Sequence, residues 1–129
     1  MSPTYRLFNG NGNKSIFISP TNAQNRLTLH VLTSPKKVNG VSLTNRRAEV
    51  RISRQIDPRG PDCKDCTPVR EPISVVMTVS GSTSEPTLAE LKLMRDDAIA
   101  AINAAWDDLM IIGVAPTTIE LPYNVAPQE

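Results

Sequence analysis

Residues 85–112 are the stretch that most limits what this chain can fold into. Apolar residues recur there every three or four positions, which is the spacing of one face of an α-helix. This stripe consists of Leu91, Met94, Ala98, Ala101, Ile102, Ala105 and Leu109, and it is widened by Leu88, Ile99, Trp106 and Met110. The pattern predicts one long amphipathic helix whose apolar stripe spans about half of its circumference.

Both ends of the predicted helix carry residues that favour a helix end. Pro86 suits a first turn, and Thr87 to Glu90 has capping-box spacing, so Glu85 or Thr87 is expected as the N-cap. Gly113 is a natural stop. Two interpretations remain open: an ordinary core helix lying on a sheet, and a helix that also packs against a second chain.

The sequence before this helix predicts antiparallel strands. Residues 5–8 and 14–19 flank a run of Asn and Gly and are expected to form a hairpin. Three longer segments alternate apolar and polar side chains, as half-buried strands do. They are residues 26–33, 45–56 and 73–80. Residues 34–44, which contain Pro35 and Gly40, are expected to be a connection, with some strand around 41–43 as an option.

Strands followed by a helix, with no alternating strand and helix units, predict an α+β fold. It consists of an N-terminal β-hairpin, an antiparallel β-meander and a long C-terminal helix on one sheet face. The 129 residues fit one domain. Its parts are the hairpin 1–19, the sheet 26–80 with an exposed loop over 57–70, the helix 85–112 and an irregular tail 113–129. The second sheet face would stay open and polar.

Composition excludes several function classes. The net charge is +1, so no global field favours nucleic acid, and aromatic residues make up 4%, too few for a base-stacking surface. No apolar run approaches the roughly 20 residues that a bilayer crossing needs. The first residues do not resemble a signal peptide. We expect a soluble protein made in a cytoplasm, with no membrane partner.

The two cysteines, Cys63 and Cys66, form a C-x-x-C motif in the long loop. A zinc site lacks a second pair of ligands, and a redox dithiol lacks its usual βαβ setting. Two other interpretations stay open: reduced loop thiols, and cross-links between neighbouring subunits.

No residues are predicted to be catalytic. His30 has no acid or nucleophile at motif spacing, and the aspartates at 96, 97, 107 and 108 resemble a solvated helix face. We therefore expect no enzyme activity, no metal, no cofactor and no small-molecule substrate.

The basic residues are more informative by position than by number. Arg26, Arg47 and Arg51 are expected on the polar sheet face, with Lys36, Lys37 and Arg46 near the strand ends. A basic sheet face can hold phosphates, although a solvated surface gives the same pattern.

The order of elements and several short strings resemble the coat proteins of single-stranded RNA bacteriophages (leviviruses). The resemblance covers nearly the whole chain. It rests on the N-terminal hairpin, on Asn25–Val31 as the first long strand, on Asn45-Arg46-Arg47 leading the second, on a cysteine-bearing loop, on Arg70–Ser80 as the last strand and on Ser82-Thr83-Ser84-Glu85 before the helix.

The resemblance implies a structural, non-enzymatic capsid protein. Interlocked homodimers with a continuous sheet would assemble in the host bacterial cytoplasm into an icosahedral shell, expected to be T=3, around genomic single-stranded RNA. The dimer would also be able to bind an operator hairpin as a translational repressor. The resemblance implies RNA contacts at Arg26, Thr28, His30, Asn45, Arg47, Arg51 and Ser74. It implies intersubunit disulfides at Cys63 and Cys66, and a dimer interface at Leu91, Met94, Ala98, Ile102, Trp106 and Leu109.

Four features depart from the family pattern. Glu49 replaces a neutral hydroxyl, Pro72 falls where an operator-binding member has a base-stacking Tyr, residues 34–44 are longer than the usual connection, and the tail is rich in proline. Capsid formation is thus the stronger expectation. The alternative is a small dimeric RNA-binding regulator that forms no shell.

Overall fold

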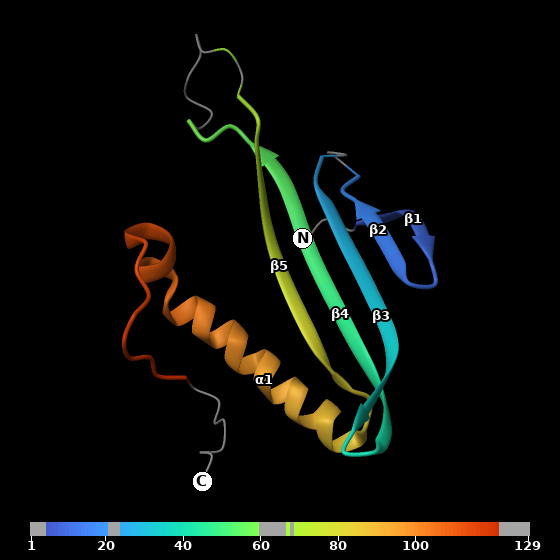
Figure 1. The fold of residues 1–129 in the computed structure, drawn as a ribbon. Coiled ribbons are helices and arrows are strands. Elements are labelled where there is room, and N and C mark those ends of the chain that lie inside the picture. Colours follow the sequence, from blue (N-terminus) through green and yellow to red (C-terminus); the bar gives the residue numbers. More distant parts are fainter. Residues whose placement is uncertain (1–4, 21–23, 60–66, 68, 122–129) are drawn as a thin grey trace.

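The structure, a computed structural model, describes residues 5–20, 24–59, 67 and 69–121. It contains one five-stranded antiparallel sheet in the order β1-β2-β3-β4-β5, followed by a helix (Figure 1). The elements are β1 Arg6–Asn11, β2 Lys14–Ile18, β3 Arg26–Val38, β4 Val41–Ile56, β5 Glu71–Ser82, α1 Glu85–Ala104 and a short π-helix, η1, over Asp107–Ile112. The predicted α+β arrangement, with the strands before the helix, is confirmed.

The prediction of a connection over residues 34–44 is wrong. β3 runs on to Val38 and β4 begins at Val41, so only a two-residue turn remains between them. Asn39 and Gly40 have φ of 50° and 81°, the left-handed values that an Asn-Gly hairpin turn needs. Pro35 fits into β3 because its pairing with β2 ends at His30, so on that side no described strand needs the missing N–H.

The register sorts the side chains into an apolar and a polar sheet face, as the alternation predicted. On the apolar face the residues lie in rows across the strands. These rows are Phe17, Leu27, Ile52 and Val75, then Leu29, Val50 and Met77, then Val31, Ala48 and Val79. The opposite face carries the intervening residues, which are mostly polar but include Leu32 and Val76.

Helix α1 begins on the apolar face, against the end of β5. A Cβ added to Gly81 would meet Leu91 Cδ1 at 2.9 Å and Thr87 Cγ2 at 3.1 Å, so the missing side chain lets the helix approach the strand closely. From this contact α1 runs away from the strands (Figure 1). The helix therefore covers one end of the apolar face and leaves the rest open.

The observed helix differs from the predicted one at both ends. Its N-cap is Ser84, rather than Glu85 or Thr87, and the Ser84 hydroxyl accepts a hydrogen bond from the Thr87 amide at 3.4 Å. The α-helix ends at Ala104 and is followed by the π-helix, so residues 85–112 are helical in two parts. Gly113 ends the second part with φ of 86°, as the stop signal predicted.

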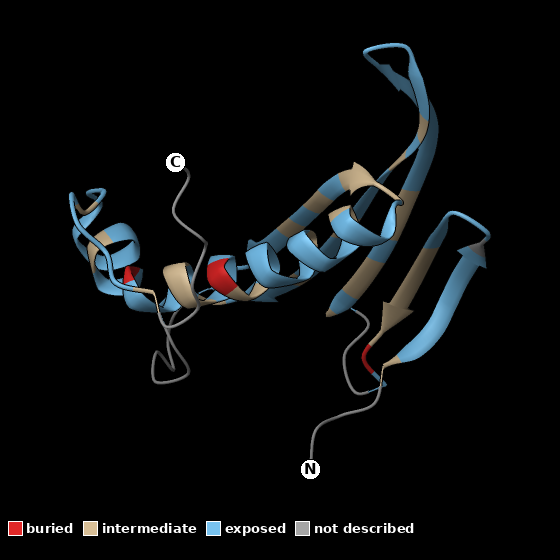
Figure 2. Cartoon of the chain, turned by 90° about the horizontal axis from the view of Figure 1, so that it is seen from below, coloured by how far each residue is buried: buried red, intermediate tan, exposed pale blue. Residues whose placement is uncertain are grey.

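The interior of the described chain is unusually small. Its buried residues are Ala105, Ser19 and Asp97, and no large side chain is fully buried (Figure 2). Asp97 was expected on a solvated helix face, and that expectation is wrong, because it is 5% exposed and neither carboxylate oxygen has a hydrogen-bond partner. A domain of this length normally buries a sizeable core, so the described part of the chain leaves much apolar surface exposed.

Candidate nucleic-acid interface

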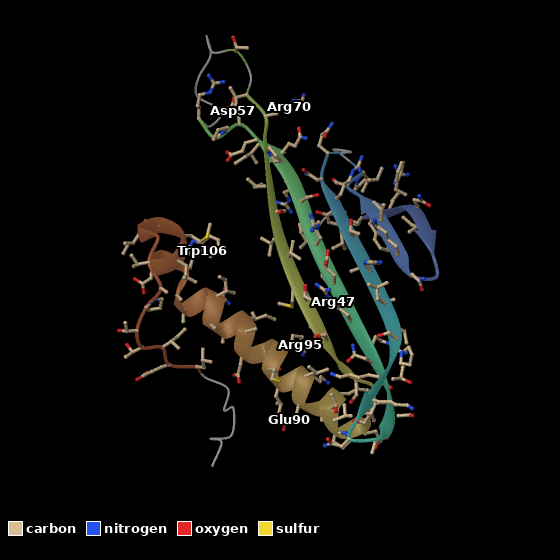
Figure 3. All side chains as sticks on the ribbon, viewed as in Figure 1. Arg47, Asp57, Arg70, Glu90, Arg95 and Trp106 are labelled. Atoms are coloured by element: carbon tan, nitrogen blue, oxygen red, sulfur yellow. The ribbon has the colours of Figure 1, made fainter. Side chains whose placement is uncertain are left out.

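The polar sheet face brings together all seven residues predicted to contact RNA. Cross-strand pairing places Arg26 beside Ser53 and Ser74, Thr28 beside Arg51, and Asn45 at the far end opposite Ser34. His30 and Arg47 fall in the rows between them. Figure 3 labels Arg47 on β4, in this row of side chains. The common face is a consequence of uninterrupted period-two register over three long strands.

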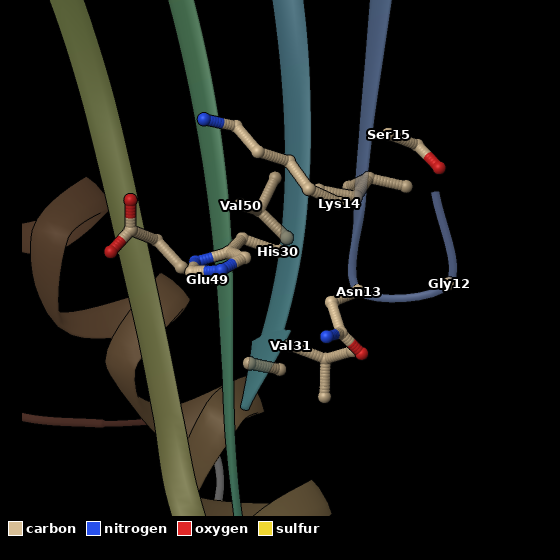
Figure 4. Close-up of a pocket in the computed structure, with 10 residues that line it drawn as sticks. Gly12, Asn13, Lys14, Ser15, His30, Val31, Glu49 and Val50 are labelled. Atoms are coloured by element: carbon tan, nitrogen blue, oxygen red, sulfur yellow. The ribbon is translucent and has the colours of Figure 1, made fainter. Parts of the chain in front are cut away.

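Charge on the polar face is mixed rather than uniformly positive. Glu49 forms an ion pair with Arg51, with 3.7 Å between Oε1 and Nη2, and both side chains are partly exposed. Glu49 also lies directly opposite His30, and Figure 4 shows the two side chains next to each other. An exposed ion pair of this length is weak. Arg51 can therefore exchange Glu49 for a phosphate at little cost.

A polar hollow of about 320 Å³ lies at the end of the polar face near β2 and the long loop. Arg26, Ser53 and Arg54 line it together with Gln24, Gln55 and Pro72. The two glutamines were not predicted, because residues from three separate segments meet there and no local pattern in the sequence signals it. Pro72 offers no aromatic ring for a base to stack on.

Comparison with solved structures identifies the fold. The chain is similar to a virus-like particle of bacteriophage PQ-465, with 25% identity, a TM-score of 0.78 and coverage of 98% of this chain and 100% of that one. The chain has the fold of RNA-phage coat proteins. A virus-like particle of bacteriophage ESE001 is 16% identical at a TM-score of 0.65, covering 94% of this chain and 100% of that one.

A third similar structure is a virus-like particle of Beihai levi-like virus 32, with 15% identity, a TM-score of 0.63 and coverage of 95% of each chain. No protein-family model and no curated protein matches the sequence. The likeness to phage particles over the whole chain supports a capsid protein and a place in the virion.

The predicted interface residues of this coat-protein fold lie along α1 and its extension. Leu91 is half-buried against β5, whereas Met94, Ala98, Ile102, Trp106 and Leu109 are exposed. Trp106 lies at the end of the helix farthest from β5 (Figure 3), and 48% of its surface is accessible. The described part of the chain thus leaves these five residues of the stripe exposed.

The base of the loop between β4 and β5 is tied by one carboxylate. Asp57 accepts hydrogen bonds from the Arg59 side chain and amide and from the Val69 amide, and Arg59 also donates to the Thr67 carbonyl. The side-chain hydrogen bond from Arg59 is the main cause that lowers the pKa of Asp57 to about 2. Figure 3 shows Asp57 and Arg70 at this same end of the sheet. Cys63 and Cys66 lie outside the described residues.

Other kinds of site find little support in the described part of the chain. No group of three or more His, Cys, Asp or Glu side chains is placed there to hold a metal ion. Among the described helices, none is both long and apolar enough to span a membrane.

Proposed function

We propose that this chain is the coat protein of a single-stranded RNA phage, whose homodimers assemble in the host cytoplasm into an icosahedral shell around genomic RNA. The observation that carries the proposal is the full-length likeness to phage virus-like particles. The large uncovered apolar surface of the single chain supports it independently.

The dimer is proposed from two apolar surfaces that complement each other. One is the open part of the apolar sheet face, where Leu29 and Ile52 are both 40% exposed and a hollow of about 230 Å³ opens beside Ser15 and Val31. The other is the exposed π-helix, where Ile111 is 71% exposed. A stable interface buries about 1,200–2,000 Å² in total. A second copy that lays its helix over this face would cover both surfaces.

The free edge of β5 supports a continuous sheet across the dimer. β5 pairs with β4 over its whole length, from Glu71 to Ser82, and no described strand lies on its other side. An unprotected edge of twelve residues is a template for pairing with another strand. The two-fold copy of β5 would satisfy its backbone groups.

RNA binding is proposed for the polar face, mainly through phosphates. Arg26, Arg47 and Arg51 supply guanidinium groups suited to phosphate oxygens. On β3, β4 and β5 this face carries no Phe, Tyr or Trp side chain. Packaging of RNA is therefore the primary proposed activity. Repression through an operator hairpin is a finer proposal. Because Pro72 offers no aromatic ring for a base to stack on, the hairpin would have to be recognised through other contacts.

Subunit cross-linking through Cys63 and Cys66 completes the proposal. The hydrogen bonds from Arg59 and Val69 to Asp57 hold the two ends of the loop together at its base, which supports a common position for this loop in every subunit. Neighbouring loops around a symmetry axis could then form disulfides once particles leave the reducing cytoplasm.

Expression followed by size-exclusion chromatography and negative-stain electron microscopy tests the proposal. Closed shells with nucleic-acid absorbance are expected. For the RNA face, the double change Arg47→Glu and Arg51→Glu should give particles poor in RNA, and unaltered packaging would count against that face. A dimer that binds RNA but forms no shell under any salt condition would favour the regulator instead.

A further inference from the structure

The hairpin of β3 and β4 extends beyond the rest of the sheet. β2 pairs with β3 no farther than His30, and β5 pairs with β4 no farther than Asn45. From Pro35↔Thr44 to Val38↔Val41 the two strands pair with no third described strand, and the backbone tie to the rest of the chain is at Thr44, whose carbonyl accepts a hydrogen bond from the Thr83 amide at 2.9 Å. These four residue pairs extend about 14 Å. We call residues 35–44 the ribbon; Figures 1 and 2 show it at the end of the sheet where α1 begins.

The ribbon is covered by little of the described part of the chain. Leu43 is half-buried and every other ribbon residue is exposed, with Val41 at 57%. A two-stranded hairpin on its own is at best marginally stable in water. A partner that covers the ribbon in the assembled protein would stabilise this exposed hairpin.

The charge of the ribbon indicates which partner that is. The first 48 residues contain seven Lys and Arg and no Asp or Glu, whereas all 13 acidic residues come later. Lys36 and Lys37 lie in the ribbon, and Arg46 and Arg47 lie at its base. None of the ion pairs in the described part of the chain involves any of these four. The ribbon thus presents uncompensated positive charge, which fits an anionic partner.

The positive groups lie on both sides of the ribbon. Lys36 shares the polar face with Arg47, while Lys37 and Arg46 point to the opposite face, where Arg46 Nε donates to the Thr33 hydroxyl at 3.3 Å. A ribbon two strands wide can therefore contact phosphates on either side. This differs from the flat polar face, where Glu49 already pairs with Arg51.

We propose that the ribbon is a second RNA-binding element in addition to the flat face. It contacts the phosphate backbone of single-stranded RNA through both faces of the ribbon. This rests on the proposed function as an RNA-enclosing coat protein. Residues 33–48 contain no aromatic side chain, so the contact reads charge and not base identity. The extra hairpin length then extends the cationic surface beyond the sheet, toward RNA that the flat face does not reach.

Salt dependence of RNA binding tests the ribbon directly. The double variant Lys36→Gln and Lys37→Gln is compared with wild type for binding to a random-sequence single-stranded RNA over a range of salt concentrations, below the protein concentration at which shells form. Loss of two phosphate contacts should reduce the slope of log K against log salt by about 1.4. The variant Lys36→Arg and Lys37→Arg should keep the slope. Lys92→Gln, which removes one exposed charge from α1, should leave it unchanged.

Each other outcome has a defined meaning. An unchanged slope in the Lys36→Gln and Lys37→Gln variant overturns the proposal. A variant that loses its shells but keeps the wild-type slope also overturns it, because the ribbon would then contact a neighbouring subunit. If the wild-type protein binds no RNA at all, the proposed RNA packaging fails first, and the ribbon proposal fails with it.

Discussion

Replacing Trp106 with alanine should weaken the proposed dimer strongly. A buried Trp removes about 150–250 Å² from water, and in the single chain 48% of its surface is still exposed, so about 100 Å² is left for a partner. At about 25 cal/mol per Å² this area contributes about 2.5 kcal/mol per subunit, and about 5 kcal/mol in a two-fold dimer. Each 1.4 kcal/mol is tenfold, so Kd should rise by three to four orders of magnitude.

Sedimentation equilibrium over nanomolar to micromolar protein measures this change. The matched control is Lys92→Ala, an exposed position on α1 that should leave Kd unaltered. Far-ultraviolet circular dichroism checks that the Trp106→Ala chain keeps its strands and helix. A folded variant with wild-type Kd and normal shells would refute the reasoning that this helix packs on a second copy.

Three further predictions follow from local geometry. Gly81→Val should lower the free energy of unfolding by about 1–3 kcal/mol in chemical denaturation, because a side chain there collides with Leu91; an unchanged midpoint would contradict the close packing. Because the pKa of Asp57 falls from 3.8 to about 2 on folding, its stabilising effect is complete above pH 3.8 and is lost as the pH falls through 2. The difference in melting temperature between wild type and Asp57→Asn should therefore shrink over that window, and a constant difference would exclude the ionised carboxylate as its cause. Cys63→Ser with Cys66→Ser should abolish ladders of linked subunits on non-reducing gels, and ladders that persist would assign the cross-links to another cause.

Local pattern predicted the sheet and its two faces well. Side-chain alternation has a strict period of two, so the grouping of Arg26 with Thr28 and His30 followed from the sequence once those residues were assigned to a strand. The Asn39-Gly40 turn carried an equally strong signal. Pro35 and the neighbouring lysines, which are common in connections, point the other way and favour a loop. The structure explains how a strand can contain Pro35: β3 has no described neighbour on one side there, and such an edge tolerates proline.

Features that depend on distant residues could not be predicted in this way. The hollow lined by Gln24 and Gln55 forms where three segments meet. The burial of Asp97 depends on which parts of the fold pack around the helix. The local sequence carries no sign of it, because Asp97 stands in a run of polar residues that is typical of an exposed helix face. The change to a π-helix at Asp107 likewise has no counterpart in the apolar period, which continues through Leu109 and Met110.

Electron microscopy of the purified wild-type protein, read together with its ratio of absorbance at nucleic-acid and protein wavelengths, tests the central claim most directly. Uniform closed shells that carry RNA are the predicted result, and their diameter would also test the expected T=3 arrangement. A protein that stays dimeric at every salt concentration, even with added RNA, would contradict the account of a coat protein.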